Sequence, residues 1–244
     1  MMKFWLPYFT ILTALPCYAG DLSDEYARTQ IQQQTIINQQ WGLVATVIRF
    51  DKKHQARFKL IDVASRKPRD NASNYWQKNN NSVIINGGYF GHDFSPIGYY
   101  KINNKIINTH ISKKLSGFVA IKNTGEIALL SKSDLAQTKA DNTYSTLMQA
   151  GPYIIDPNGL LGIHNNNHKR HQRTVIASTR SGDILVISTA PISLYNLAHA
   201  LQTEFPEIER ALNLDGGPSS ALITSKVTLL NRLPVRSYIV ATLD

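Results

Sequence analysis

The sequence predicts one strand-rich domain of the α+β class, with mixed or antiparallel sheets and a few packed helices. Short apolar runs separated by turn residues recur from Trp41 to the end of the chain, which is typical of strands. Only residues 193–205 show a clear helical spacing of apolar side chains. The 244 residues, of which 43% are apolar, are enough for one large core, and no low-complexity linker divides them.

Residues 1–19 have the pattern of a secretory signal peptide. One early charge, Lys3, precedes an apolar run, and cleavage is expected after Ala19. The alternatives are a buried N-terminal helix and an uncleaved anchor, although the run is short for a membrane span. Cleavage would remove Cys17, the only cysteine, and with it any disulfide or thiol ligand. We therefore expect a periplasmic or secreted protein without stable membrane insertion.

The expected domain covers residues 41–244. Before it, residues 20–40 are polar and rich in glutamine, and we expect either a helix or a loose arm there. Inside the domain, three hairpins are predicted, each joining two β-branched runs through a polar turn. These hairpins cover residues 42–63, 118–131 and 174–189, and the runs 226–230 and 236–243 are expected to be further strands.

The one predicted helix has recognisable ends. Apolar residues recur at helical spacing from Leu194 to Phe205. Ser193 is a candidate N-cap, and Pro206 follows the last apolar position, where it prevents the helix from continuing.

The formal net charge of +9 favours anionic partners. Nucleic acid is not expected, because the only basic run is HKRHQR at 168–173. Phosphorylated glycans or anionic lipid surfaces fit an exported protein better, and a basic surface without a specific partner is the alternative. The histidines at 164, 168 and 171 fit no familiar metal-binding spacing, so we expect neither a metal ion nor a cofactor. The oligomeric state is left open.

Two segments place an asparagine and a glycine pair after an apolar run, VIINGGYF at 83–90 and ALNLDGGPSS at 211–220. Adjacent glycines let main-chain N–H groups face a ligand, and successive N–H groups can bind an anion. Two capped turns are the alternative, and a nucleotide-type phosphate loop is excluded because the required lysine is missing. The candidate binding residues in these segments are Asn86, Gly87, Gly88, Tyr89, Asn213, Asp215, Gly216, Gly217, Ser219 and Ser220.

Further candidates lie between these two segments. Arg173 directly precedes a predicted strand, where a guanidinium can hold a phosphate by two parallel hydrogen bonds. Thr174 follows it, and Gln149 lies in a turn of small residues. His171 is a candidate for acid–base chemistry or leaving-group assistance. We interpret residues 168–170 as an exposed basic loop.

Four motifs together resemble the phosphodiester glycosidase family. In chain order they are NGGYF at 86–90, QAGP at 149–152, QRT at 172–174 and NLDGGPSS at 213–220. The resemblance extends from about residue 80 to residue 243. The last motif usually reads DGGGSS in this family, whereas here Pro218 replaces the third glycine and removes one N–H group.

The resemblance implies an exported hydrolase, some of whose bacterial relatives are linked with exopolysaccharide. It cleaves a sugar, with N-acetylglucosamine as a candidate, from a sugar-1-phosphodiester at the C1–oxygen bond and leaves a phosphomonoester. An oxocarbenium-like transition state requires a carboxylate near C1, for which Asp215 is the candidate. The departing phosphate requires preorganised donors, among them Arg173. A second carboxylate is not identified, and Asp93, Glu126 and Asp156 are weak candidates.

Two other functions remain open. A non-catalytic binder of phosphorylated envelope glycans or glycolipids would use Arg173 but would not need an ionised Asp215. An envelope assembly module would be indifferent to Arg173→Ala in a small-ligand assay. The enzyme hypothesis requires residues 86–90, Arg173 and residues 213–220 to meet in one cleft.

Overall fold

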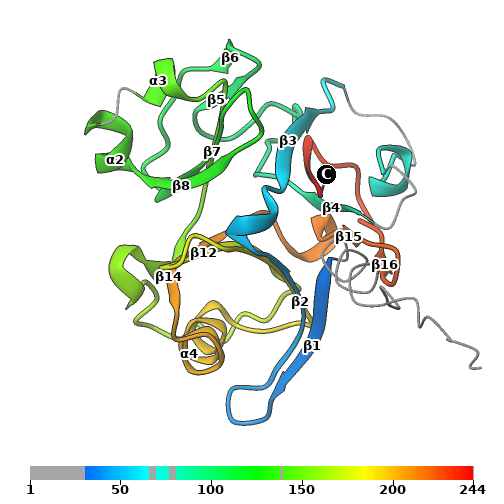
Figure 1. Ribbon diagram of the computed structural model, residues 1–244, viewed down its shortest axis with the longest axis vertical. Coiled ribbons are helices and arrows are strands. Elements are labelled where there is room, and N and C mark those ends of the chain that lie inside the picture. The colour runs from blue at the N-terminus through cyan, green and yellow to red at the C-terminus, as the bar shows by residue number, and fades with distance from the viewer. Residues whose placement is uncertain (1–30, 66–69, 77–80, 138–139, 244) are drawn as a thin grey trace, which may run out of the picture.

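The computed structural model describes residues 31–65, 70–76, 81–137 and 140–243. In these residues the chain forms three β-sheets, and every strand pair is antiparallel (Figure 1). The strand-rich architecture with antiparallel sheets is confirmed. Helices are few, so the fold is closer to all-β than the predicted class implies.

The largest sheet has seven strands. Its central strands are apolar on both faces, because one face meets the other sheets and the other face is covered by a helix. Across the sheet the strands are β1 (Gln32–Asn38), β2 (Leu43–Phe50), β13 (Ile184–Thr189), β12 (Thr174–Thr179), β14 (Ile208–Asn213), β10 (Tyr153–Asp156) and β11 (Leu160–Leu161).

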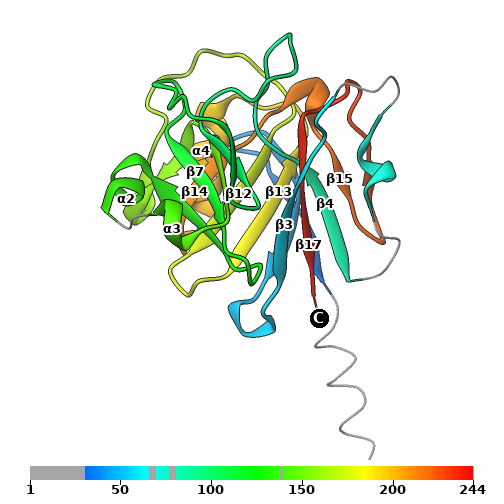
Figure 2. The ribbon, with the colours of Figure 1, turned by 90° about the horizontal axis from the view of Figure 1, so that it is seen from above.

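Two five-stranded sheets complete the fold. Figure 2 shows the strands β3, β4 and β17 of the second sheet, whose side chains share the central core with those of the seven-stranded sheet. The second sheet contains, in order, β16 (Thr228–Leu229), β15 (Leu222–Ile223), β4 (Ser82–Asn86), β17 (Ser237–Thr242) and β3 (Arg57–Asp62). The third contains β6 (Lys105–Asn108), β5 (Tyr100–Ile102), β9 (Thr146–Ala150), β7 (Gly117–Ile121) and β8 (Ile127–Ser131).

One core lies between the three sheets, and each sheet buries a second face on its outer side. Side chains from all three sheets pack in the central cluster, among them Ile48, Ile85 and Val119. Because alternate residues of a strand point to opposite faces, the neighbours of these side chains fill the outer clusters. Burial on both faces explains why many strands read as continuous apolar runs rather than as an alternation.

The longest described helix is α4 (Leu194–Glu204), which packs on the outer face of the seven-stranded sheet. The Ser193 side chain accepts a hydrogen bond from the N–H of Asn196, so the predicted N-cap is confirmed. Two shorter helices, α2 (Lys132–Gln137) and α3 (Ala140–Thr143), lie beside the third sheet. Four 3₁₀ turns complete the described elements: η1 (Lys52–His54), η2 (Ala72–Asn74), η3 (Pro157–Gly159) and η4 (Gly217–Ser219).

Two of the three predicted hairpins are confirmed, β7–β8 and β12–β13. The third, over residues 42–63, is wrong. Its two runs do form strands β2 and β3, but β2 pairs with β1 and β13, whereas β3 pairs with β17 in another sheet. The turn at residues 51–56 therefore carries the chain from one sheet to the next. Of the two late strands, 236–243 is confirmed as β17, and 226–230 contains only the short β16.

The segment at residues 20–40 also differs from the expectation of a helix or a loose arm. Its described part contains β1, which pairs with β2 over seven residue positions. The main domain therefore begins before Trp41. The predicted signal peptide and its cleavage after Ala19 lie outside the described residues. No helix in the described residues is long and apolar enough to cross a membrane.

Candidate active site

The four sequence motifs meet where strands of all three sheets end. Asn86 ends β4, Ala150 ends β9 and Asn213 ends β14, while Thr174 begins β12. Because β12 and β14 are antiparallel, the start of one lies beside the end of the other, and Val175 pairs with Asn213. In Figure 2, η4 (orange) and the connection before β12 (yellow-green) reach the same upper edge of the molecule. The predicted convergence of these distant segments is confirmed.

Asn86 connects the second sheet to the seven-stranded sheet at this edge. Its side chain is fully buried, and its Oδ1 atom accepts hydrogen bonds from Thr174 Oγ1 (2.7 Å) and from the N–H of Ala221 (3.0 Å). Its Nδ2 group donates to the main-chain oxygen of Asp215 (2.8 Å). All of these partners belong to the protein, so Asn86 and Thr174 position the Asp215 turn rather than face a ligand.

Gln149 has an equally internal position. Its Oε1 atom accepts from the N–H groups of Tyr99 (3.0 Å) and Ser112 (2.9 Å). Its Nε2 group donates to the main-chain oxygens of Ser112 (2.9 Å) and Leu115 (3.0 Å). A buried amide with four partners cannot also bind a substrate. Gln149 therefore fixes the loop that precedes β7.

The glycine pairs allow close packing of backbone at the site. A Cβ atom on Gly87 would lie 2.2 Å from Ser237 Oγ, and one on Gly216 would lie 2.7 Å from the main-chain oxygen of Gln172. No side chain fits at either distance. These two glycines therefore let β4 approach β17 and let the Asp215 turn approach the Arg173 segment.

The N–H groups of the four glycines do not form the predicted anion-binding concavity. Gly87 donates to the main-chain oxygen of Ser237 (2.7 Å), and Gly217 donates to that of Gln172 (2.9 Å). The N–H group of Gly88 lies 3.1 Å from the sulfur of Met148. The N–H of Gly216 is taken by the carboxylate described next, so all four have partners inside the protein.

Asp215 is half-buried at the start of the η4 turn. Its Oδ1 atom accepts a hydrogen bond from the N–H of Gly216 (2.8 Å). Burial raises the pKa of the Asp215 carboxyl above its ordinary value, and hydrogen bonds from the Ser219 side chain and the Gly216 N–H oppose that rise. Among the described residues it forms no ion pair. The carboxylate is therefore held in place without being neutralised.

Arg173 is the cation of the site. Its guanidinium donates to the main-chain oxygens of Ile192 (3.2 Å) and Lys169 (3.1 Å), which fix its direction. Within the described part of the chain no carboxylate pairs with it. Burial lowers its pKa, although a guanidinium stays charged at any physiological pH. A fixed, half-buried guanidinium without a counter-ion is suited to hold an anionic ligand.

The hydroxyl of Tyr89 lies within electrostatic reach of both charged groups. Burial raises the pKa of Tyr89 above its usual range, the charge of Asp215 raises it further, and Arg173 opposes that rise. The hydroxyl donates to the main-chain oxygen of Leu214 (2.9 Å) and accepts from the side-chain amide of Asn213. Tyr89 is therefore a neutral hydrogen-bonding group next to both Asp215 and Arg173.

Two buried polar atoms at this edge have no partner among the described residues. They are Oδ1 of Asn213 and Oγ of Ser220, and both side chains are about 2% exposed. An unsatisfied buried acceptor is unfavourable by about 1–3 kcal/mol. These two atoms are the groups with free hydrogen-bonding capacity beside Asp215, and Ser219, the neighbour of Ser220, uses its own hydroxyl for that carboxylate.

Pro218 stands where the family motif usually has a third glycine, and the structure accommodates it. It lies in the first turn of η4, where a backbone N–H has no helical partner and the fixed φ of proline fits. Its carbonyl accepts from the N–H groups of Arg232 (2.8 Å) and Leu233 (3.3 Å). Proline therefore stiffens the turn that follows Asp215.

His171 lies on the exposed rim of the site. Its main chain bridges to Ile192, and its Nδ1 atom lies 4.0 Å from the position that a Cβ atom on Gly217 would occupy. Residues 168–170 are exposed, as predicted. In the part of the chain that the structure describes, no group of three His, Cys, Asp or Glu side chains is arranged to hold a metal ion.

The three weak candidates for a second carboxylate are engaged elsewhere. Asp93 is bound by Ser95, and Glu126 pairs with Lys122 in the β7–β8 hairpin. Asp156 lies at the end of β10 that is remote from the site, just before η3. None of the three is a described partner of Asp215.

The groups that orient Arg173 could not be identified from the sequence. They are the main-chain oxygens of Ile192 and Lys169 and the hydroxyl of Thr189, which accepts from the Arg173 N–H (3.1 Å). Main-chain oxygens carry no residue-specific signature. Only Thr189 had a usable signal, since it ends the run 184–189 that was predicted to pair with the strand after Arg173.

Comparison with solved structures shows the fold. The catalytic domain of zebrafish N-acetylglucosamine-1-phosphodiester α-N-acetylglucosaminidase, auto-inhibited by its pro-peptide, is 14% identical with a TM-score of 0.62, and 88% of this chain and 82% of that chain are covered. A hypothetical protein from Synechocystis is 17% identical with a TM-score of 0.59, covering 87% and 62%. A Burkholderia pseudomallei protein described as exported is 11% identical with a TM-score of 0.59, covering 82% and 74%.

Sequence comparison agrees with the structural one. No curated protein sequence matches the chain. The model of the phosphodiester glycosidase family, however, matches residues 79–240, which is more than half of the chain and includes all four motifs. The chain therefore belongs to the phosphodiester glycosidase family.

Proposed function

We propose that this protein is an exported hydrolase that removes a sugar from a sugar-1-phosphodiester and leaves a phosphomonoester. The observation that carries the proposal is that a carboxylate, Asp215, and a guanidinium, Arg173, neither with an ion-pair partner among the described residues, come from segments joined by a hydrogen bond from the N–H of Gly217 to the main-chain oxygen of Gln172 (2.9 Å), and that both act electrostatically on the Tyr89 hydroxyl. A sugar-1-phosphodiester needs both kinds of group, a carboxylate for the sugar carbon and a cation for the phosphate.

Asp215 acts at C1 of the sugar. As the C1–oxygen bond breaks, positive charge develops on the sugar ring, and a nearby carboxylate stabilises it. The carboxylate either attacks C1 itself or takes a proton from the attacking water. In both cases the water oxygen ends on C1, and the bonding electrons leave with the phosphate. The hydrogen bonds from Ser219 and Gly216 favour the ionised form that either role requires.

Arg173 binds the phosphate. The leaving group is already acidic, so its departure depends on stabilisation of negative charge more than on protonation. The guanidinium is held by two main-chain oxygens before any ligand arrives. No reorganisation is then needed as charge develops on the leaving oxygen.

The buried atoms Asn213 Oδ1 and Ser220 Oγ have unused hydrogen-bonding capacity beside Asp215, and a small opening of the η4 turn would let a substrate group use it. A sugar offers hydroxyl and amide hydrogens that can satisfy such atoms. The relative from zebrafish acts, according to its name, on an N-acetylglucosamine-1-phosphodiester, and N-acetylglucosamine is our first choice of sugar. Export rests on the predicted signal peptide.

A panel of sugar-1-phosphodiesters tests the proposal. Each compound is incubated with the purified protein, and free sugar and phosphomonoester are measured together. We expect both products in equal amounts from at least one compound, and much slower release by Asp215→Asn. Binding without turnover across the panel would instead identify a non-catalytic glycan-phosphate binder. Neither binding nor turnover would favour an assembly module.

A further inference from the structure

The loop before β12 places fixed positive charge beside the phosphate-binding guanidinium. We propose that Lys169 and Arg170 form a second anion subsite, which selects substrates whose group beyond the scissile phosphodiester carries a further phosphate or carboxylate. This inference rests on the proposed function and extends it to the part of the substrate that leaves with the phosphate.

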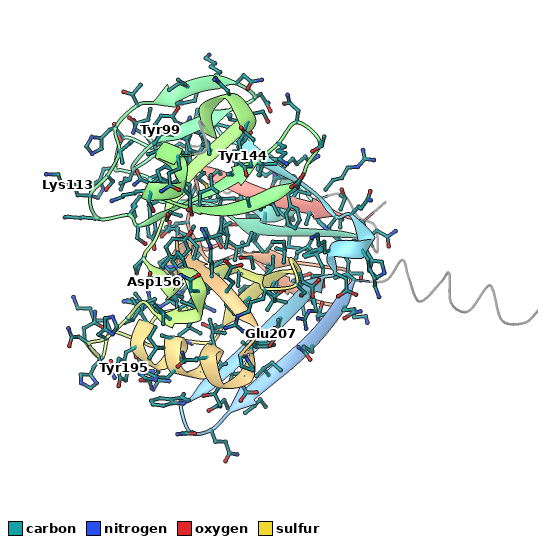
Figure 3. All side chains as sticks on the ribbon, turned by 60° about the vertical axis from the view of Figure 1, so that its left-hand side comes forward. Tyr99, Lys113, Tyr144, Asp156, Tyr195 and Glu207 are labelled. Carbon is teal, nitrogen blue, oxygen red and sulfur yellow. The ribbon has the colours of Figure 1, made fainter. Side chains whose placement is uncertain are left out.

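The loop is anchored rather than loosely attached. Near its start, the side-chain amide of Asn166 donates to Asn196 Oδ1 on α4 (3.2 Å). Near its end, Nε and Nη2 of Arg170 donate to the main-chain oxygen of Pro191 (3.2 and 3.0 Å). Figure 3 shows this connection beside Tyr195 of α4, with side chains projecting outward from the same margin of the molecule. The backbone that carries the cations is therefore held in a defined position.

One hydrogen bond connects this loop directly to the site. The guanidinium of Arg173 donates to the main-chain oxygen of Lys169 (3.1 Å). The backbone of Lys169 is thus in contact with the group proposed to hold the scissile phosphate. A long lysine side chain that starts from this position can reach an anion attached one or two bonds beyond that phosphate.

The positive charge of the loop has no acidic partner. Lys169 and Arg170 are exposed, and neither forms an ion pair with any of the described residues. The sequence contains no Asp or Glu at all in residues 157–182 or in residues 216–243. Asp215 is thus the only acidic residue between Glu209 and Asp244.

This charge distribution differs from that of an ordinary solvated surface. Several acidic residues elsewhere in the described part of the chain pair with cations, as Asp183 and Glu207 do with Arg49. Residues 157–182 and 216–243, which flank the site, contain no acidic residue that could pair with the cations of the loop. A surface with positive charge and no acidic residues attracts ligands with several negative charges and has little effect on neutral ones. The expected leaving group is therefore a phosphorylated or carboxylated alcohol.

Two matched substrates test the subsite. Both are diesters of the sugar 1-phosphate that the protein hydrolyses best, one with ethanol and one with 2-hydroxyethyl phosphate, which adds a second phosphate to the same two-carbon chain. The ratio of their kcat/KM values is measured at low and at high salt. We expect the wild-type ratio to favour the charged diester by about two- to fivefold per engaged cation at low salt, and to fall towards one at high salt.

Variants assign the preference to the loop. Lys169→Gln with Arg170→Gln should lower the ratio towards one, Lys169→Glu should invert it, and Lys169→Arg should retain it. The matched control, Lys59→Gln with Lys105→Gln, removes two exposed positive charges from β3 and β6 and should leave the ratio unchanged. A wild-type ratio of one, or a ratio that falls equally in the control, would overturn the subsite and leave a solvated basic loop.

Failure of the proposed function gives a different result. If neither diester of N-acetylglucosamine 1-phosphate is hydrolysed, the two compounds are compared by equilibrium binding with the same variants. Tighter binding of the charged diester that depends on Lys169 and Arg170 supports the subsite without turnover. Equal binding of both diesters overturns it.

Discussion

The hydroxyl of Tyr89 donates a 2.9 Å hydrogen bond to the main-chain oxygen of Leu214, the residue directly before Asp215. The same hydroxyl accepts a hydrogen bond from the side chain of Asn213. Tyr89 follows the first glycine pair and Asp215 precedes the second, so this contact joins the two glycine motifs across the site. It also fixes the backbone from which the Asp215 carboxylate projects.

Tyr89→Phe should reduce kcat by about 10- to 100-fold and change the unfolding free energy by only about 1 kcal/mol. The ring remains, but Leu214 loses a donor and the Asn213 amide loses an acceptor, so the carboxylate is less well positioned. Steady-state kinetics and urea denaturation measure the two effects. Tyr195→Phe, on α4, is the control. Unchanged kinetics in Tyr89→Phe would show that the contact has no positioning role.

Asp215→Asn should abolish most of the activity and make the protein more stable at neutral pH, by about 1 kcal/mol. Burial raises the folded-state pKa of Asp215 above its unfolded value. Stability linked to this group is therefore present below the unfolded pKa and is lost as the pH rises through the folded pKa. The stability advantage of Asp215→Asn should therefore disappear at pH values below the ordinary carboxyl pKa of 3.8.

Asp93→Asn gives the control for that measurement, with the opposite sign. Hydrogen bonds from Ser95 lower the pKa of the exposed Asp93 carboxyl. Its ionised form thus favours the folded state above the unfolded pKa, and the variant should lose stability at neutral pH. Melting temperatures of both variants, measured across the pH range, test whether Asp215→Asn gains stability and Asp93→Asn loses it at neutral pH. A less stable Asp215→Asn at neutral pH would contradict the conclusion that burial destabilises the ionised form of Asp215.

The acid limb of the pH–rate profile should respond to Ser219. Its hydrogen bond lowers the pKa of Asp215, against the effect of burial. Ser219→Ala removes that bond, so the carboxylate becomes ionised only at higher pH. The acid limb of kcat/KM, which reports on the free enzyme, should move upward. A limb that stays in place would mean that another group controls activity at low pH.

The buried amide of Asn86 should matter for stability rather than for ligand binding. Asn86→Ala removes four hydrogen bonds at the junction of two sheets and should lower the unfolding free energy by about 2–4 kcal/mol. Thr174→Val removes only one donor to the amide and should lower it by about 1–2 kcal/mol. Urea denaturation of the single and double variants should show losses that are less than additive.

Local features of the fold could be predicted from the sequence. The helix with its Ser193 cap and the hairpins β7–β8 and β12–β13 each depend on residues that are close along the chain. The pairing of β2 with β13 could not be predicted, because an apolar strand fits several partners equally well. β1 was expected to be a helix or an arm for a different reason, because its mostly polar residues show no strong alternation of polar and apolar side chains.

The sequence predicted that the four motifs meet at one site, but it predicted the roles of the individual residues only in part. Four motifs in a fixed order indicated one site, and the structure brings them together. Asn86 and Gln149 have the composition of ligand-binding residues, yet their amides are used to bind the backbone. Sequence alone cannot distinguish a glycine that exposes its N–H from one such as Gly216, where the backbone of Gln172 leaves no room for a Cβ atom.

The position of bond cleavage tests the central claim most directly. The purified protein hydrolyses a sugar-1-phosphodiester in water enriched in oxygen-18, and mass spectrometry locates the label in the products. Attack at C1, assisted by Asp215, predicts that the released sugar carries the heavy oxygen and that the phosphomonoester carries none. Label in the phosphomonoester would show attack at phosphorus, and the assignment of Asp215 to the sugar carbon would then be wrong.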